Sequence, residues 1–510
     1  MTKSWTKEHK GVLVFADAIP GALTWIAFFS ALVGLLVFPR AWLTFCACFM
    51  CYFVLRMVFT LVFYVTGEYR IRSWERCDWT AGEHSAGPGG FSPAEAWHVV
   101  IVPNYKEPVE ILERTLDGLA IQHRAAERVV VVLGMEERES GSAEKGRILA
   151  EKYADRFARV LVTVHPGGLP DELPGKSSNQ SWAATEAYEV LANEMDVPLD
   201  RMTVTSCDAD SVLHPRYFAA VSKMFALDTR RHARFFQAPL FYTNNLWQVP
   251  GPTRFTMWLG HACQLAELAV PFYEPLPIST YTLSLQTAAE AGWWDPMVIA
   301  EDWHNYLNVM FERRGDVKLL PVFLPTRGDA TDGDSFFSGL KNRHDQVMRH
   351  SWGAEDCAYV LRRIVKERHF HGPAIFRFVQ VLHDHVMRTA GWFLVISTYL
   401  LVPLAKPVYA ASMTRVIVVD HGIPILPYVL GTGAVALVTT VAMQVVRFPP
   451  PGGWKSPKLV LELVFHWLTM AFFGFYLGAL PAWRAQTRLM FGIPLVYKVT
   501  PKRAVREAAA

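Results

Sequence analysis

The chain has 510 residues, enough for two or three domains, and hydrophobic residues make up 51% of it. Its formal net charge of +3 is too small to indicate a nucleic-acid-binding protein, and no basic run with interleaved aromatic residues occurs. Its seven cysteines are far apart or lie within an apolar segment, which excludes a disulfide framework and is typical of a reducing compartment.

The first 66 residues are apolar apart from a basic start. Segments 23–39 and 41–65 are nearly free of charge, and each is long enough to cross the hydrocarbon core of a membrane. We predict a retained transmembrane hairpin over residues 1–66 rather than a cleaved signal peptide, because no small-residue cleavage pattern follows the first segment. Lysines precede the hairpin and arginines follow it at 70–76, so the positive-inside rule places both flanks in the cytoplasm.

The last third of the chain is again apolar. Segments 391–403, 423–446 and 459–480 predict a C-terminal transmembrane region over residues 391–482, with interfacial helices before it at 361–390. The tail, residues 483–510, is basic and is therefore expected in the cytoplasm. Three simple spans would leave that tail on the opposite side. One of the three segments is thus expected to be re-entrant or interfacial, or to hide a hairpin.

The block between these regions, residues 67–360, is polar and has the length of a soluble domain. Short apolar runs alternate in it with segments of helical character. The expected strands are 97–103, 128–133, 160–164 and 202–206. This alternation predicts an α/β domain with a doubly wound, mostly parallel sheet, in which the carboxyl ends of the parallel strands share one edge.

Two aspartates stand directly after the fourth expected strand. Asp208 and Asp210 are separated by one residue and can direct carboxylate oxygens at one hard cation, Mg²⁺ or Mn²⁺. Ligands of open α/β sheets bind at this edge, and such a cation clamps diphosphates. An Asp-x-Asp turn is also common without any function, so the pair alone does not indicate a metal site and further motifs are needed to support one.

Four further motifs accompany this pair in order along the chain. They are Pro103-x-Tyr105-x-Glu107, Lys176-x-x-Asn179, Glu301-Asp302, and Gln346-Val347-Met348-Arg349 followed by Trp352. In order and approximate spacing the five resemble the motifs of membrane-embedded family 2 glycosyltransferases, which include cellulose, hyaluronan and chitin synthases and ceramide glucosyltransferases. The resemblance covers roughly residues 97–360 together with the flanking apolar segments.

The resemblance implies a GT-A-like fold and an inverting hexosyltransferase that moves a sugar from a nucleotide sugar, expected to be a UDP-sugar, to a lipid or a growing glycan. Asp208 and Asp210 would hold the metal ion, and Asp302 would be the general base, with Glu301 as the next candidate. Asp302 also begins a predicted helix, where an acidic residue stabilises the helix dipole without any catalytic role. The few membrane segments favour a lipid or short glycan acceptor over a long polysaccharide.

The resemblance also implies residues that bind the two substrates. The donor-binding set is Pro103, Tyr105, Glu107, Glu136, Lys176, Gln346, Arg349 and Lys502, and the acceptor-binding set is Trp352 and Trp303. Glu136 stands where the family usually has an aspartate for the base of the nucleotide, and a solvated loop carboxylate is an equal alternative. In the family a tryptophan directly follows the arginine, whereas two residues intervene before Trp352 here, which leaves the aromatic platform open. Lys502 lies in 497–502, a segment similar to the gating loop of cellulose synthases.

The resemblance implies an integral protein of the inner or plasma membrane with a cytoplasmic catalytic domain. A rival interpretation is a catalytically silent membrane scaffold or binding module that keeps the glycosyltransferase fold. The presence of every expected acidic and basic group argues against the rival. Donor turnover by the purified protein separates the two.

Overall fold

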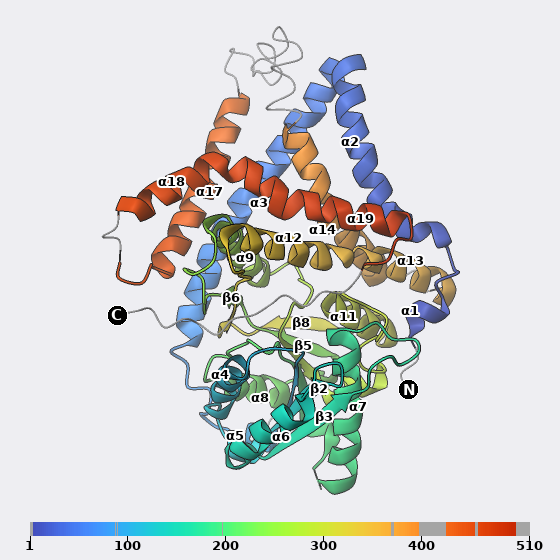
Figure 1. Cartoon of the computed structure of the whole chain (residues 1–510), viewed down its shortest axis with the longest axis vertical. Helices are drawn as coiled ribbons and strands as arrows, with labels where there is room; N and C mark the ends of the chain where they lie inside the picture. The colour runs from blue at the N-terminus through green and yellow to red at the C-terminus, as the bar shows by residue number, and fades with distance from the viewer. Residues whose placement is uncertain are drawn as a thin grey trace.

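A computed structural model describes residues 4–86, 88, 90–195, 197–368, 372–396, 425–453 and 457–495. Long helices gather at one end of the molecule, a sheet with its covering helices lies at the other, and a belt of helices crosses between them (Figure 1). The described part of the chain therefore has the layout that the sequence predicts, with an α/β domain next to apolar helices.

The main sheet has seven strands in the order β3-β2-β1-β4-β7-β5-β8. These are β1 (Trp97–Pro103), β2 (Val129–Glu136), β3 (Arg159–His165), β4 (Met202–Ser206), β5 (Arg234–Gln237), β7 (Tyr281–Ser284) and β8 (Lys318–Pro321). Strands β1 to β4 are parallel, whereas β7 runs antiparallel to both β4 and β5. A second, two-stranded sheet pairs β6 (Leu240–Tyr242) with β9 (Thr326–Gly328). The predicted doubly wound, mostly parallel sheet is confirmed.

Helices cover both faces of the sheet because alternate strand residues point to opposite sides. Val99 and Ile101 of β1 share one buried cluster with α7 (Lys176–Glu194), α10 (Leu285–Glu290) and α11 (Glu301–Glu312). Val100 and Val102 share the other cluster with α4 (Val109–Ala120), α6 (Ser142–Lys152) and α8 (Tyr217–Leu227). Both faces are therefore apolar, which is why the strands are continuous hydrophobic runs.

Four helical stretches of the described residues are long and apolar enough to cross a membrane: Val14–Gly34, Thr44–Trp74, Tyr428–Arg447 and Val460–Met490. The first stretch covers η1 (Val14–Ala18) and most of α2 (Ile19–Val37). The others fall in α3 (Pro39–Trp74), in α17 (Ile425–Arg447), and in α18 (Pro457–Gly474), which continues through η7 (Phe475–Ala479) into α19 (Leu480–Met490). Large apolar side chains such as Phe59, Val435 and Leu468 are exposed on them. A lipid environment accounts for such surfaces. Of the predicted segment 391–403, only the first six residues are described, as the end of α14 (Gly372–Ile396).

The belt consists of α12 (Phe336–Trp352), α13 (Glu355–Glu367) and the continuous helix α18 to α19, all of which run across the direction of α2 and α3 (Figure 1). Of the alternatives expected for the three C-terminal apolar segments, which are a re-entrant segment, an interfacial segment and a hidden hairpin, this direction corresponds to the interfacial one. Beneath it, α9 (Gly251–Ala269) packs against α3, α17 and α18. The short helices of the described residues include α1 (Trp5–Glu8), η1 (Val14–Ala18) and α5 (Ala125–Arg128).

Candidate active site

A cavity of about 1120 Å³ begins at the carboxyl ends of the parallel strands and continues between the helices of the belt. Its lining includes Pro103, Tyr105, Glu107, Glu136, Lys176, Asp208, Asp210, Glu301, Asp302, Trp303, Gln346 and Arg349, all singled out from the sequence. Pro103 and Glu136 end β1 and β2, Lys176 begins α7, and Glu301 begins α11. Motifs that are more than two hundred residues apart in the chain thus meet at one edge of the sheet.

Lys176 is the central cation of this edge. Its Nζ lies 2.8 Å from Asp208 Oδ1, 2.7 Å from Glu301 Oε1 and 3.6 Å from Asp302 Oδ1. It also donates a hydrogen bond of 3.0 Å to the carbonyl oxygen of Ser279. One ammonium group therefore ties the Asp-x-Asp turn to the start of α11.

Burial and neighbouring charges shift the pKa values of Lys176 and Asp302. Burial opposes the charge of Lys176, but Asp208, Asp302 and Glu301 outweigh it and raise the pKa of Lys176 well above its ordinary value. Burial, Glu301 and Asp208 raise the pKa of Asp302, against the opposing effects of Lys176 and the backbone N–H of Ser279. A carboxylate with a raised pKa is a better proton acceptor than an ordinary aspartate, which suits a general base.

Ser279 is a residue that the sequence did not point out. Its N–H donates to Asp302 Oδ2 at 2.6 Å and its hydroxyl donates to Asp208 Oδ2. Its φ of +57° lies in the left-handed region that favours glycine, so the backbone holds a strained conformation here. It precedes β7, whose antiparallel direction brings its start beside the end of β4, where Ser206 pairs with Tyr281. Because Ser279 precedes an antiparallel strand instead of following a parallel one, the search for polar residues after parallel strands does not identify it.

Asp329 is a second residue that the sequence did not single out. Its N–H donates to Asp210 Oδ2 at 3.2 Å, and its Oδ1 accepts hydrogen bonds from Arg114 at 2.6 Å and Asn244 at 2.8 Å. Burial and the charge of Asp210 raise the pKa of Asp329. Within the described residues its buried Oδ2 finds no hydrogen-bond partner. Asp329 follows the short strand β9, for which the sequence gives little signal.

Asp208, Asp210 and Asp329 offer carboxylate oxygens to the cavity lining. Among the residues that the structure describes, no group of three or more His, Cys, Asp and Glu side chains is arranged to hold a metal ion. Mg²⁺ sites of phosphate-processing enzymes use only one or two carboxylates, with substrate phosphates and water as the remaining ligands. The aspartates therefore fit such a cation only if a bound diphosphate completes its coordination.

The donor-binding side of the prediction lies around Tyr105. Its N–H donates to Glu107 Oε2 at 2.6 Å, and the guanidinium of Arg138 lies 4.6 Å from the centre of its ring. Arg138 also forms an ion pair with Glu136. Glu136 is almost fully buried, so it is not the solvated loop carboxylate that the sequence left open.

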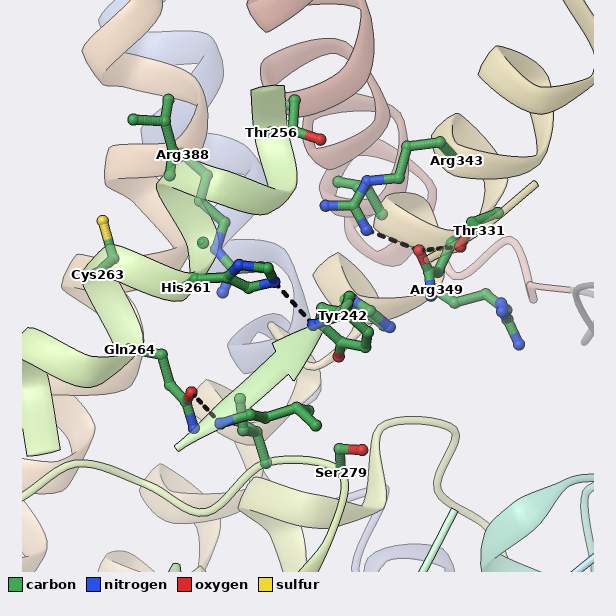
Figure 2. Close-up of a pocket in the computed structure, with 18 of the residues that line it drawn as sticks. Tyr242, Thr256, His261, Cys263, Gln264, Ser279, Thr331, Arg343, Arg349 and Arg388 are labelled. Atoms are coloured by element: carbon green, nitrogen blue, oxygen red, sulfur yellow. Dashed lines mark hydrogen bonds between the residues drawn. The ribbon is translucent and has the colours of Figure 1, made fainter. Parts of the chain in front are cut away.

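Helix α12 supplies the polar side chains opposite the sheet (Figure 2). Gln346 Oε1 accepts hydrogen bonds of 2.6 Å from Arg343 and from Thr331. Arg349 lies on the same helix and lines the cavity. The family motif singles out Gln346 and Arg349, whereas nothing in the sequence marks Arg343.

The two tryptophans of the predicted acceptor set are placed differently. Trp303 lines the cavity, and its ring lies 5.3 Å from that of His385. Trp352 is buried outside the lining in a cluster with α19, and its Nε1 donates to Glu355 at 3.0 Å. The two residues inserted after Arg349 move Trp352 around the helix, away from the cavity. Lys502 and the segment 497–502 lie outside the described residues.

No family model matches the sequence, and no curated protein matches it. Among solved structures, the chain is similar to the mannosyltransferase PcManGT from Pyrobaculum calidifontis in complex with GDP-Man and Mn²⁺, with a TM-score of 0.42 and 15% identity over 87% of this chain and 98% of that chain. It is also similar to S. aureus TarS 1–349 in complex with UDP-GlcNAc, with a TM-score of 0.31 and 13% identity over 71% of this chain and 93% of that chain. Similarities at this level do not establish a shared function.

Proposed function

We propose that the protein is an inverting glycosyltransferase that moves a hexose from a nucleotide sugar to a membrane-associated acceptor, a lipid or a growing glycan. The proposal extends to a UDP-sugar as donor, to Asp302 as the general base and to Mg²⁺ or Mn²⁺ held by Asp208 and Asp210. Membership of family 2 and a cytoplasmic catalytic domain at the inner or plasma membrane belong to the same proposal.

The observation that carries the proposal is the contact of Lys176 with Asp208, Glu301 and Asp302 in one cavity. These carboxylates come from two of the five sequence motifs, and the lysine comes from a third. A protein that keeps the fold only as a scaffold has no need to hold three carboxylates within 4 Å of one ammonium group. The shared cavity thus supports an enzyme over a silent module.

Each of the cavity residues has a separate role in the proposed reaction. Asp302 accepts the proton of the acceptor hydroxyl while the oxygen of that hydroxyl attacks the anomeric carbon. Ser279 and Lys176 hold the carboxylate of Asp302 in place. Arg349 presents a guanidinium that can fork onto the departing diphosphate. A bound Mg²⁺ or Mn²⁺ would supply the remaining positive charge on that diphosphate.

The test uses the full chain purified in detergent, with UDP-sugars, GDP-sugars and Mn²⁺ supplied in turn and release of the nucleoside diphosphate followed over time. Asp302→Asn should lower transfer by roughly a hundred- to ten-thousandfold while leaving donor binding nearly intact, because a general base acts on the acceptor. Donor binding is measured by calorimetry on the same preparation.

Asp345→Asn is the matched control, because Asp345 lies on the outer side of α12 in an ion pair with Lys341 and does not line the cavity. It should retain transfer. If Asp302→Asn transfers normally, Asp302 only stabilises the start of α11, and Glu301 becomes the candidate base. If the wild-type protein turns over no nucleotide sugar, the scaffold interpretation replaces the enzyme.

A further inference from the structure

His385 of α14 is a buried polar side chain to which the proposed reaction gives no role. It is 1% exposed and lines the cavity, and within the described residues neither its Nδ1 nor its Nε2 has a hydrogen-bond partner. Buried polar groups of folded proteins are almost always hydrogen-bonded, and an unpaired one costs free energy. An imidazole with both nitrogens unpaired at the wall of a cavity is therefore a candidate for binding a ligand.

The position of His385 is fixed by the helices around it. Gln486 of α19 donates a hydrogen bond of 2.8 Å to its carbonyl oxygen. The centre of its ring lies 5.3 Å from that of Trp303 on α11, in an edge-to-face arrangement. Packing against neighbouring elements therefore sets the direction of the imidazole, although neither of its nitrogens is bonded to them.

The ring also lies close to the start of α11, which carries the proposed base. A Cβ atom on Gly353, the residue after α12, would lie 3.6 Å from His385 Nε2 and 3.2 Å from the Cβ atom of Ala300. Ala300 is two residues before Asp302, and all four of these residues line the cavity. An acceptor of the size of a sugar ring that reaches Asp302 is therefore expected to lie within reach of His385.

The surroundings of His385 favour a neutral imidazole. In the described part of the chain no carboxylate oxygen lies within 4.0 Å of its ring nitrogens. The charged group that acts on it is Arg388, one turn further along α14 and also at the cavity wall (Figure 2). A neutral imidazole has one N–H donor and one acceptor nitrogen. Hydroxyl groups both donate and accept and can pair with both nitrogens, whereas the oxygens of an ionised phosphate only accept.

We infer that His385 binds at least one hydroxyl group of the acceptor other than the one that is attacked, so that the acceptor carries a head with two or more hydroxyl groups. This inference rests on the proposed sugar transfer and narrows its acceptor. The indole of Trp303 beside His385 offers an apolar surface to the C–H groups of such a head. No bond forms or breaks at His385, which holds the acceptor while Asp302 takes the proton of the attacked hydroxyl group.

Two other ligands match the position of His385 less well. A metal ion needs several ligands, and no group of three or more His, Cys, Asp and Glu side chains of the described residues is arranged to hold one. A simple long-chain alcohol has a single hydroxyl group, which the proposed reaction uses at Asp302. A head with further hydroxyl groups can bind at both residues.

The test uses the full chain in lauryldimethylamine oxide, a detergent without hydroxyl groups, and compares the binding of octanol, octyl glycerol ether and octyl glucoside by calorimetry. The probes share one alkyl chain and differ in their hydroxyl groups. The wild-type protein should bind each of the two polyhydroxylated probes at least about fivefold more tightly than octanol. Equal binding of all the probes overturns the inference.

His385→Phe keeps an aromatic ring and removes both nitrogens, so it should abolish this preference. His385→Gln retains a donor and an acceptor and should keep part of it. Because the imidazole makes no hydrogen bond within the described residues, His385→Phe should melt at the wild-type temperature or above it. A lower melting temperature with an unchanged preference would show that His385 is structural and that the inference is wrong.

His383→Phe is the matched control, because His383 lies on the same helix, pairs with the hydroxyl group of Tyr52 at 2.6 Å and does not line the cavity. It should keep the preference of the wild-type protein. If His385→Phe weakens the binding of UDP-glucose as strongly as that of octyl glucoside, His385 belongs to the donor site and the inference is wrong.

These outcomes separate the inference from the proposed function. Sugar transfer by a wild-type protein that binds octanol as tightly as the polyhydroxylated probes would leave the glycosyltransferase proposal standing and remove the inference. A preference that depends on His385, in a protein that turns over no nucleotide sugar, would remove the proposed function and leave only a binding site for hydroxyl-bearing lipids.

Discussion

Lys176 holds Asp208 and the two carboxylates at the start of α11 together, and these three groups would repel one another without it. Ser279 adds neutral donors to Asp208 and Asp302. The sequence motifs predict which charged residues gather at the sheet edge, because several of these motifs directly follow parallel strands, whose carboxyl ends share that edge. They do not predict Ser279 or Asp329, which contribute through backbone groups and through position in the fold.

At this scale we expect Asp208→Asn and Asp210→Asn each to abolish metal-dependent transfer, since each removes a charged oxygen ligand from the cavity. The direct measurement is calorimetric titration of Mn²⁺ into the protein with UDP present, in which each variant should bind at least about tenfold more weakly. Lys176 keeps Glu301 as a partner in both variants, so their melting temperatures should stay close to the wild-type value.

Asp228→Asn serves as the control, because Asp228 pairs with Arg234 and does not line the cavity. It should bind Mn²⁺ as the wild-type protein does. Wild-type transfer in excess chelator would contradict a role for the cation.

The N-terminal segment is fixed to the α/β domain by a buried network. The hydroxyl of Ser4 donates to Asp295 at 3.0 Å, and His304 of α11 lies 2.7 Å from Asp356 and 3.7 Å from Asp295. The acidic partners overcome burial and raise the pKa of His304 to about 10. His304 is therefore an imidazolium ion at neutral pH and joins α11, α13 and the start of the chain.

His304→Gln should destabilise the protein by about 3 to 5 kcal/mol, because it leaves buried carboxylates without their cation. The folded-state pKa of His304 is raised above the ordinary 6.5, so its contribution is complete below pH 6.5 and disappears as the pH rises toward about 10. The wild-type melting temperature should fall between pH 6.5 and pH 10, and that of the variant should fall less. His84→Gln, at a side chain that is 78% exposed, should behave like the wild type, and equal pH slopes for His304→Gln would argue against the network.

Among the elements, the sequence predicts β1 to β4 to within a few residues, since each is a charge-poor run rich in β-branched residues, and β1, β2 and β4 are buried on both faces. The strands β5, β7 and β8 have four residues each and are not marked by the sequence. Their pairing is set by contacts between distant segments, such as Phe235 opposite Leu283. The antiparallel direction of β7, which brings Ser279 to the cavity, also depends on contacts between distant segments, so the local sequence pattern does not predict it.

In the whole molecule, the number of apolar helices that cross the membrane determines on which side of it the C-terminal tail lies. The helices α2, α3, α14 and α17 run roughly together in Figure 1, with α14 packed against α2, whereas α18 to α19 runs across them. The expected cytoplasmic tail requires an even number of crossings, which α2, α3, α14 and α17 would provide if α18 to α19 lay along the membrane. The sequence predicts the apolar segments from composition, but their directions follow from tertiary packing.

A reporter that fluoresces only in the cytoplasm, fused after Ala510, should therefore be active, because the tail is expected on the same side as the catalytic domain. A phosphatase that folds only outside the cytoplasm, fused at the same position, should be inactive and serves as the control. Active phosphatase would contradict both the cytoplasmic tail and an interfacial position of α18 to α19.

In the proposed reaction, the contacts of Lys176 would also couple the metal-binding aspartate to the proposed base. Asp208 raises the pKa of Asp302, so whatever neutralises Asp208, a divalent cation included, lowers the affinity of Asp302 for its proton. The ammonium group, relieved of Asp208, keeps its contacts with Glu301 and Asp302 and favours their ionised forms. Loading of the donor side would then switch the base on before the acceptor hydroxyl is attacked. By the reciprocity of linked equilibria, deprotonation of Asp302 would in turn tighten the hold on the cation.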